Sequence, residues 1–464
     1  MKIGWVRGAA IFAMLVAAVL GCGCGGSEPV LPDVVIVTLD TLRADHVGGY
    51  GGLAETPTLD RLAAQGTLFE RVVAPLPETR PSHATLMTSQ YPRHHGLVSN
   101  SHSLAEDAVS VVEVYRAAGY QTGGFVGCAL FTPESGLQQG FDHFAESSTP
   151  QRPSHEVVPL AREWLAGLDP DRPFFMWLHL FDPHMPYEPP HPSPAGPGEA
   201  DVEAFTWPLL MAAAKRNEGN VPGPLLERAR TLYRQEVEHM DGQLGLILAD
   251  LEARPKWDST IVLATADHGE CFGNGIYFDH SYCLGEGALA VPLILRADGV
   301  EAGDRRGAVV ELLDVAPTLL RLSGIEVPKA FAGWGLLART DGPPSDAFFQ
   351  HPFYQAEALA GRLKVFETLR AVAGESVRPV SGERLQAGIR RRQLKLVVDG
   401  DETVLYDLEE DATESSDLSS MQPELTAELM AALRSWLAGA PLKVADPETI
   451  NPELRKQLEA LGYL

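Results

Sequence analysis

Short runs of β-branched and other apolar residues recur along this chain, and such runs are typical of strands buried on both faces. Three runs are followed within a few residues by side chains that can bind a metal, and these runs are 34–39, 173–180 and 259–266. The polar residues that follow them are Asp40, Asp182, His184, Asp267 and His268. Open α/β sheets hold their ligands at the carboxyl ends of their strands. The pattern therefore predicts that these side chains meet at one edge of one sheet and outline a metal site.

Helical patterns alternate with the strands. Apolar residues recur at helical spacing in segments 58–65, 109–118, 155–167, 225–252 and 309–322. Further strands are expected at 67–73 and 122–126. The alternation predicts an α/β fold, with a large, mostly parallel sheet covered by helices on both faces. Residues 186–223 are rich in Pro, Gly and Ala, which predicts a long irregular insertion that is either a functional lid or a surface excursion.

The C-terminal part has a different texture. Two apolar runs, 393–398 and 403–408, flank Asp399-Gly400, which is a strong hairpin signal. A helical pattern follows at 423–437. We therefore expect a catalytic domain at 33–360 and a small C-terminal α+β subdomain with an antiparallel sheet at 361–464.

The N-terminus has the pattern of a targeting segment. Basic residues precede an apolar stretch at 9–20 that is short for a membrane span. Gly21-Cys22 follows and resembles a bacterial lipoprotein cleavage site, so residues 1–24 are expected to be a signal segment and 25–32 a linker. Lipidated Cys22 would then anchor the chain to a membrane. An ordinary secretory signal and an uncleaved anchor are the alternatives, and each predicts export to the periplasm or cell envelope.

The net charge excludes one class of partner, and the cysteine positions suggest a possible disulfide. The 464 residues carry a net charge of −25, which argues against nucleic acid because a phosphate backbone needs a basic surface. Of the five cysteines, Cys271 and Cys283 bracket a loop. In an oxidising compartment they can form a disulfide, but two buried thiols fit the sequence equally well.

A candidate nucleophile lies in the run Thr79-Arg-Pro81-Ser82-His83. This run resembles the signature of the sulfatases and their relatives in the alkaline phosphatase superfamily, where Pro-Ser follows the nucleophile after one intervening residue. Other family landmarks occur in the expected order, at 39–45, 91–96, 179–187, 267–270, 291–293, 314–318 and 405–408. The resemblance covers nearly the whole mature chain and implies the fold predicted above.

Some positions depart from the family pattern. Sulfatases carry Cys or Ser at the nucleophile position and oxidise it to formylglycine, an aldehyde that Thr79 cannot form. Thr41 replaces the second acid of the usual Asp-Asp pair, His83 replaces the usual Arg, and residues 127–129 lack the expected Lys and His. The pattern resembles instead the zinc or manganese site of phospho-transferring relatives.

The resemblance implies four metal ligands, Asp40, Thr79, Asp267 and His268. Mixed oxygen and imidazole ligands favour Zn²⁺ or Mn²⁺, although Ca²⁺ also fits, and one or two ions can be accommodated. Such a cation would lower the pKa of the Thr79 hydroxyl and make it a nucleophile.

Three histidines are candidates for hydrogen-bonding the ester oxygens or protonating the leaving group, namely His83, His184 and His280. His280 has an alternative role, in which it joins Asp182 around a second ion.

The sequence thus predicts an exported, metal-dependent hydrolase of small-molecule, glycan or lipid esters. Sulfate or phosphate esters are the expected substrates, with phosphorus esters favoured, and Thr79 would form a covalent intermediate. Two alternatives stay open. One is a transferase that moves a phospho-substituent onto cell-envelope glycans or lipids, and the other is a binding module whose catalytic site has decayed.

Overall fold

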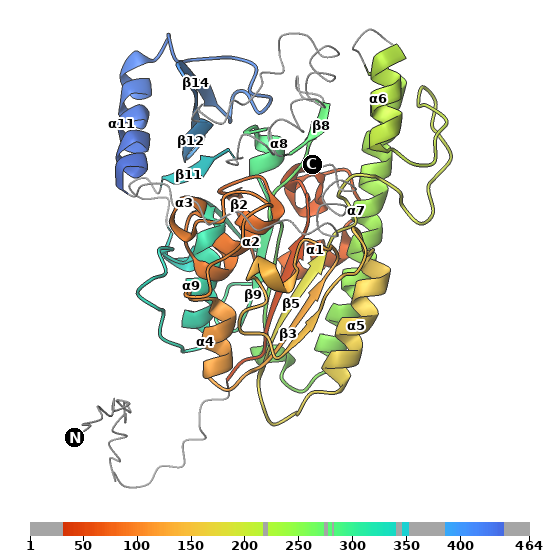
Figure 1. Ribbon diagram of the computed structural model, residues 1–464, viewed down its shortest axis with the longest axis vertical. Coiled ribbons are helices and arrows are strands. Elements are labelled where there is room, and N and C mark those ends of the chain that lie inside the picture. The colour runs from red at the N-terminus through yellow and green to blue at the C-terminus, as the bar shows by residue number, and fades with distance from the viewer. Residues whose placement is uncertain are drawn as a thin grey trace, which may run out of the picture. The chain divides into compact units, whose positions relative to one another are not determined.

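An eight-stranded sheet is the centre of this computed structural model (Figure 1). The structure describes residues 31–216, 221–272, 277–280, 283–339, 346–351 and 386–439. Across the sheet the strands are β10 (Asp304–Glu311), β2 (Thr67–Val73), β9 (Leu293–Arg296), β6 (Ile261–Thr265), β1 (Val34–Leu39), β5 (Phe174–Leu180), β3 (Gln121–Val126) and β4 (His143–Ala145). Only β9 runs antiparallel to its neighbours within this sheet. The predicted mostly parallel sheet is confirmed.

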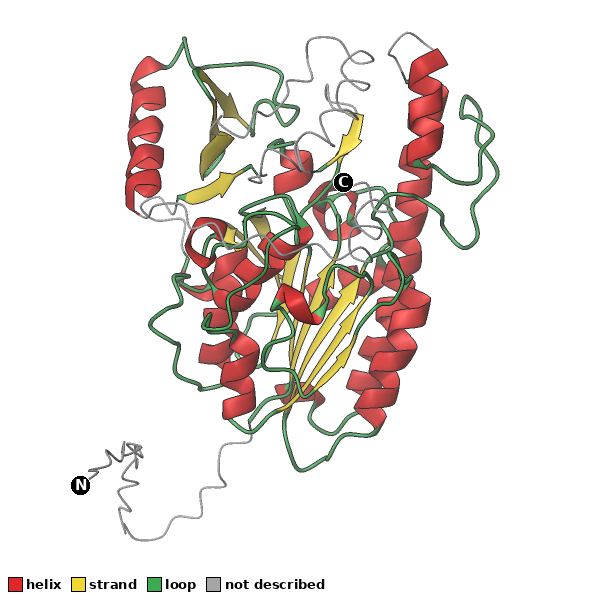
Figure 2. Cartoon of the chain, in the orientation of Figure 1, coloured by secondary structure: helices red, strands yellow, loops and turns green. Residues whose placement is uncertain are grey.

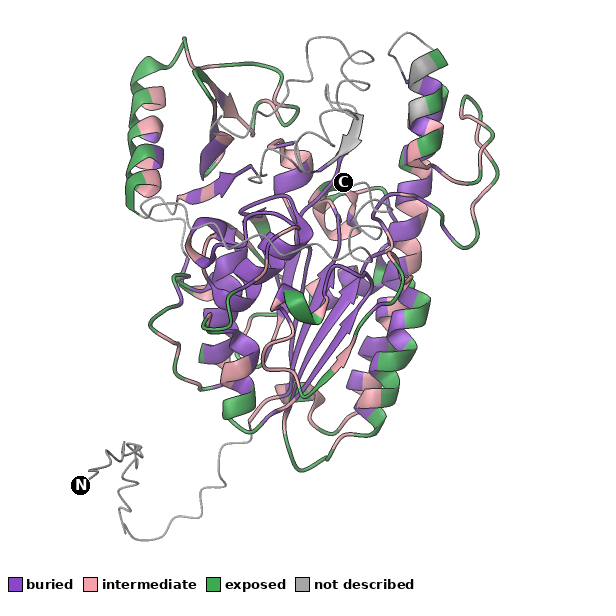
Figure 3. Cartoon of the chain, viewed as in Figure 1, coloured by how far each residue is buried: buried purple, intermediate pink, exposed green. Residues whose placement is uncertain are grey.

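The strands in the middle of the sheet are continuous apolar runs, which explains why they occupy its most buried positions. Every residue of β1, β5 and β6 is buried, as the colouring of Figure 3 shows. Strands that are covered on both faces need apolar side chains on both faces, which is why these segments are continuous apolar runs.

Helices lie on both sides of the sheet (Figure 2). On one side α5 (Ser154–Ala166) and α1 (Pro57–Gln65) both pack against the long helix α7 (Gly223–Glu252). On the other side α2 (Thr79–Thr88) contacts its neighbours α3 (Pro92–His95), α4 (Val111–Ala117) and α9 (Val315–Leu322). Short 3₁₀ turns connect several of these elements.

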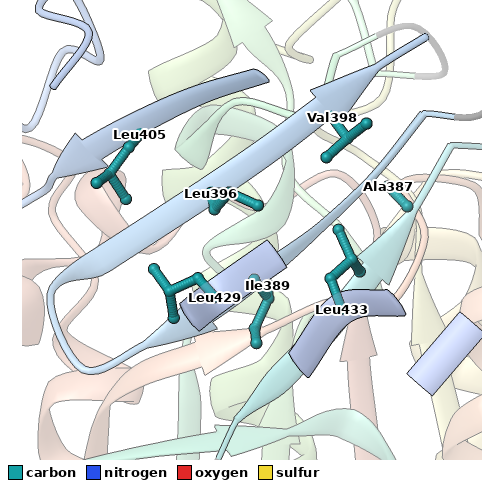
Figure 4. Close-up of a cluster of buried hydrophobic side chains, with 7 residues drawn as sticks. All are labelled: Ala387, Ile389, Leu396, Val398, Leu405, Leu429 and Leu433. Atoms are coloured by element: carbon teal, nitrogen blue, oxygen red, sulfur yellow. The ribbon is translucent and has the colours of Figure 1, made fainter. Parts of the chain in front are cut away.

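A smaller antiparallel sheet contains β11 (Ala347–Gln350), β12 (Gln386–Arg391), β13 (Leu394–Asp399) and β14 (Glu402–Asp407). The predicted hairpin is confirmed, because β13 and β14 pair around Asp399 and Glu402. Helix α11 (Pro423–Gly439) covers one face. Seven buried side chains form the core between them (Figure 4): Ala387, Ile389, Leu396, Val398, Leu405, Leu429 and Leu433.

Apolar and charged contacts join the two sheets. Val73 and Val309 of the large sheet pack with Ala347 and Phe349 of β11. Lys395 of β13 is fully buried, and its Nζ lies 3.1 Å from Glu286 Oε1 and 2.7 Å from Glu414 Oε1. The described residues from 32 onwards accordingly form one unit. The smaller sheet takes its first strand from before residue 361, and the division at that residue stays a prediction.

Two local predictions were wrong. The segment 309–311 belongs to β10, because the β-branched Val309 and Val310 pair with β2, and the helix starts only at Val315. Glu311 and Asp314 form a reciprocal capping box that separates the strand from the helix. The insertion at 186–223 is also not wholly irregular, since it contains α6 (Trp207–Arg216).

Other sequence predictions concern the N-terminus and the cysteines. The signal segment and Cys22 lie outside the described residues. Within the described part of the chain, no helix has the length and apolar character that crossing a bilayer requires. Cys271 and Cys283 form a disulfide, which decides the alternative left open above, and Cys128 is a buried thiol.

The buried carboxyl group of Glu311 ties β10 to its surroundings. It accepts hydrogen bonds from the Tyr91 hydroxyl at 2.7 Å and the Phe348 amide at 2.9 Å, and it pairs with Arg339 at 2.9 Å. Burial raises the pKa of Glu311 to about 7, although Arg339 opposes the shift.

This pKa predicts a pH-dependent contribution to stability. A carboxyl group with a raised pKa in the folded state favours folding below its unfolded pKa, and that contribution is lost as pH rises towards 7. Between pH 5 and 8, wild-type protein should lose up to about 3 kcal/mol of unfolding free energy relative to Glu311→Gln. Urea unfolding across this range measures the difference, with exposed Glu106→Gln as control. Parallel pH profiles for wild type and Glu311→Gln would contradict the assignment.

Candidate active site

Two acidic side chains face each other because their strands are neighbours. Asp40 follows β1 and Asp267 follows β6, and β1 and β6 pair in parallel. The carboxyl ends of these two strands therefore lie side by side at the same edge of the large sheet. One ligand atom each from Asp40, Asp267 and His268 lies within 4.8 Å of the others, and all three residues are fully buried.

The atoms of this triad suit a cation. Asp40 Oδ1, Asp267 Oδ2 and His268 Nε2 are buried and make no hydrogen bond of good geometry within the described part of the chain. Burial raises the pKa of Asp40, and burial together with the Asp40 charge raises the pKa of Asp267. Burial, reinforced by nearby His280, lowers the pKa of His268, so its imidazole is neutral and able to coordinate. These residues therefore fit a divalent ion with mixed oxygen and nitrogen ligands.

His179 supports this triad, and the sequence analysis missed it. The Gly127 amide donates to His179 Nδ1 at 3.3 Å, so Nε2 carries the proton and donates to Asp40 Oδ2 at 3.0 Å. This contact holds Oδ2 of Asp40 in place, and Oδ1 stays available as a metal ligand. The feature that could have pointed to His179 is its position as the second-last residue of β5. This position becomes informative only once β5 is known to pair with β1.

Thr79 is the first residue of helix α2 and is fully buried. Its hydroxyl lies close enough to the Asp40 carboxyl group to lower the pKa of that group, against the larger effect of burial. Asn100 holds the start of the helix through two contacts. Its backbone amide donates to the Glu78 carboxylate, and its side-chain Oδ1 accepts from the Arg80 backbone amide at 2.8 Å. The positive end of the helix dipole thus lies at the candidate nucleophile and favours an anion there.

His83 lies one helical turn after Thr79, with both ring nitrogens engaged. Nδ1 donates to the Thr79 carbonyl at 2.8 Å, and Nε2 accepts from the Thr38 hydroxyl at 3.0 Å. Trp177 donates to the same hydroxyl, which fixes this arrangement. These contacts suit a residue that positions the start of α2. The predicted direct role of His83 in catalysis stays a prediction.

His184 and His280 lie together beside the triad. Their Nε2 atoms are 3.4 Å apart, and the His280 ring stacks on His268 with a centroid distance of 4.2 Å. Each Nδ1 donates to a carbonyl, of Met185 for His184 and of Pro77 for His280, both at 2.8 Å. Burial and the neighbouring His280 lower the pKa of His184 to about 3. The structure thus brings both predicted histidines to the site.

Asp182 does not join them, and the prediction that it lies with the metal ligands was wrong. Its carboxylate accepts from the Ser154 amide at 3.0 Å and from the Ser154 hydroxyl at 2.8 Å. It therefore caps the start of α5 by accepting from the first backbone amide of that helix. A carboxylate that follows a strand fits either role, and the sequence does not distinguish them.

The sulfatase family model matches residues 32–325. The chain belongs to the sulfatase family. As such it is a hydrolase acting on sulfuric or phosphoric ester bonds, and the family generally depends on divalent metals. The match begins just before β1 and ends after α9, so it contains all the site residues described above.

Characterised relatives are distant. An arylsulfatase from Clostridium perfringens is 25% identical, with the alignment covering 66% of this chain and 77% of that protein. The multifunctional alkaline phosphatase superfamily protein PehA from Trinickia caryophylli is 25% identical, and the alignment covers 68% of this chain and 78% of PehA.

Solved structures share the fold at 20% identity. The protein BT4656, determined with its substrate D-glucosamine-2-N,6-O-disulfate, superposes with a TM-score of 0.70 over 91% of this chain and all of that chain. The phosphonate monoester hydrolase of Silicibacter pomeroyi superposes with a TM-score of 0.66, covering 90% of this chain and 97% of the hydrolase.

We expect Asp267→Asn to abolish stoichiometric metal, because it removes a ligand charge from the buried triad. Wild-type protein should contain at least about one ion per chain, and the variant below about a tenth of that. Chelator should lower the melting temperature of wild type by about 5 °C or more and leave that of the variant unchanged. Elemental analysis and calorimetry measure both quantities, with exposed Asp107→Asn as control. Equal metal content in wild type and Asp267→Asn would exclude this site.

Proposed function

We propose that this sulfatase-family protein is an exported, metal-dependent hydrolase that prefers phosphorus esters and uses Thr79 as its nucleophile. The observation that carries the proposal is the position of Thr79. Its hydroxyl lies at the start of α2 and contacts Asp40, which belongs to the triad with Asp267 and His268. The proposed nucleophile thus lies at a helix N-terminus and beside the proposed cation site.

Asp40, Asp267 and His268 would hold the cation, with Thr79 as a further ligand. Bound there, a divalent ion supplies a Lewis acid that lowers the pKa of the Thr79 hydroxyl and stabilises negative charge on the ester. His179 keeps Asp40 oriented through its 3.0 Å contact. His83 holds the first turn of α2 through the Thr79 carbonyl.

The reaction proceeds in two displacements. Thr79 gives its hydroxyl proton to solvent, Oγ1 attacks phosphorus to form a new O–P bond, and the bond to the leaving oxygen breaks. Water then attacks the phosphothreonine, the bond between Oγ1 and phosphorus breaks, and phosphate leaves while the Thr79 hydroxyl regains a proton. His184 and His280 are placed to bind the ester oxygens and to give a proton to the leaving oxygen. Burial keeps the pKa of His184 low in the free protein, whereas an anionic ester favours the protonated ring.

Phosphorus is favoured over sulfur because of the residue type at position 79. Threonine cannot form the aldehyde on which sulfatases with Cys or Ser depend, but it can form a phosphate ester that water hydrolyses. The fold shared with phosphonate monoester hydrolases is compatible with this preference. Sulfated sugars named for several solved relatives make a small-molecule or glycan ester the expected class of substrate.

Export rests on the signal-like N-terminus, with Cys22 as the proposed site of lipid attachment and membrane anchoring. The Cys271–Cys283 disulfide supports it, since such bonds persist in oxidising compartments.

A panel of esters tests the proposal. p-Nitrophenyl phosphate, bis-p-nitrophenyl phosphate, a phenyl phosphonate ester and p-nitrophenyl sulfate are each assayed with Zn²⁺, Mn²⁺ or Ca²⁺. We expect a phosphorus ester with Zn²⁺ or Mn²⁺ to give the highest kcat/KM. Thr79→Ala should lower kcat by about 10⁴-fold or more, and Thr79→Ser should retain measurable turnover.

Exposed Thr149→Ala is the matched control and should behave as wild type. Mass spectrometry after acid quenching should find the phospho group on Thr79. Retained turnover in Thr79→Ala would remove this residue from the mechanism, and a preference for the sulfate ester would reverse the proposed substrate class.

A further inference from the structure

The Cys271–Cys283 disulfide encloses one of the site histidines. Cys271 directly follows Glu270 at the end of the metal motif, and Cys283 lies three residues after His280. Backbone pairing also joins the two ends of this loop, because Cys271 of β7 (Cys271–Phe272) pairs with Asp279 of β8 (Tyr277–Asp279). The Cys283 amide also donates to the His280 carbonyl at 3.2 Å. His280 is therefore attached on both sides to the segment that carries the metal ligands.

His280 contacts three parts of the site. Its Nδ1 donates to the Pro77 carbonyl, two residues before Thr79, and its Nε2 lies 3.4 Å from His184 Nε2. Its ring stacks on His268. The position of one imidazole thus depends on three separate segments of the site.

The disulfide packs separately from the clusters that join the sheets. Among the described residues, the two cysteines form a small apolar cluster with Ala288. Both also line a cavity of about 270 Å³, together with Phe272, Leu284 and Tyr406. The bond thus lies next to the segment that carries the metal ligands and borders a cavity.

We propose that the Cys271–Cys283 disulfide is a positioning element, which holds the His280 imidazole against His184 and His268. Opening it would release His280 from the site and leave the fold intact. The chemistry is a thiol–disulfide exchange, in which a dithiol is oxidised to its cyclic disulfide and the two cysteines become thiols. The consequence for turnover rests on the proposed function, in which His280 contacts the ester.

The test measures the accessibility of His280 directly. Full-length protein is treated with diethylpyrocarbonate, which modifies accessible neutral imidazoles, and the modified histidines are located by peptide mass spectrometry. We expect the labelling rate of His280 to rise by about tenfold or more in Cys271→Ser/Cys283→Ser, because loss of the cross-link removes one of the connections that hold His280 beside the metal ligands. His95 is the internal control, since its buried ring is held by Thr85 and the Leu97 amide and its labelling should not change.

Dithiothreitol provides an independent way to open the bond. It should accelerate His280 labelling in wild type but have no effect on the double variant. Circular dichroism melts confirm that reduced wild type and the variant still unfold cooperatively. If the double variant does not fold, reduced and alkylated wild type answers the same question. Unchanged labelling of His280 after the bond is opened would overturn the proposal.

Turnover is read separately. On the best phosphorus ester, kcat should fall by about 10²-fold with KM nearly unchanged, because a misplaced catalytic group affects mainly the chemical step. Wild type that hydrolyses none of the esters would refute the proposed function, while the labelling would still decide whether the disulfide positions His280. Faster labelling with unchanged kcat would refute the catalytic role of His280 and leave its positioning by the disulfide supported.

Discussion

Two carboxylates that share one buried edge impose the main constraint on this structure. Asp40 and Asp267 are held together by the parallel pairing of β1 and β6, and each is fully buried. Like charges in a poorly polarisable interior repel strongly, and burial already penalises each charge. The arrangement is therefore costly unless protons or a cation neutralise it. The unsatisfied oxygens, the neutral His268 ring and the family membership together favour a cation.

The surrounding contacts can be understood from this constraint. His179 donates to one oxygen of Asp40, and the Thr41 amide lies 3.4 Å from Asp267 Oδ1. The Ser82 hydroxyl donates to the Asp267 carbonyl at 2.6 Å, which joins α2 to the end of β6. The contacts of His179 and Thr41 fix the directions of the two carboxylates without neutralising them. Neutral donors can orient ligands in this way while the charge stays available for the ion.

The sequence was sufficient for the parts of the fold that follow from local pattern. Continuous apolar runs predicted the central strands, and the polar residues at their ends predicted Asp40, Asp267 and His268 as neighbours. His179 could not be found in this way, because its role depends on which strand lies beside β1. Asp182 was misplaced for a related reason, since its partner Ser154 lies on a helix that is adjacent only in space. The boundary between β10 and α9 was missed because Val309 and Val310 fit both a strand and the apolar face of a helix, and pairing with β2 decided it.

The balance of charge in the site also indicates what kind of substrate it suits. With a divalent ion bound, the charges of the two carboxylates would be neutralised, so an anionic ester would approach no net negative charge from these groups. The start of α2 offers the positive end of its dipole, and an anion bound beside the buried histidines would favour their protonated rings. A neutral ester would gain little from either. In the proposed displacement, both interactions would become stronger as charge builds up on the equatorial oxygens, and they would then favour the transition state over the ground state.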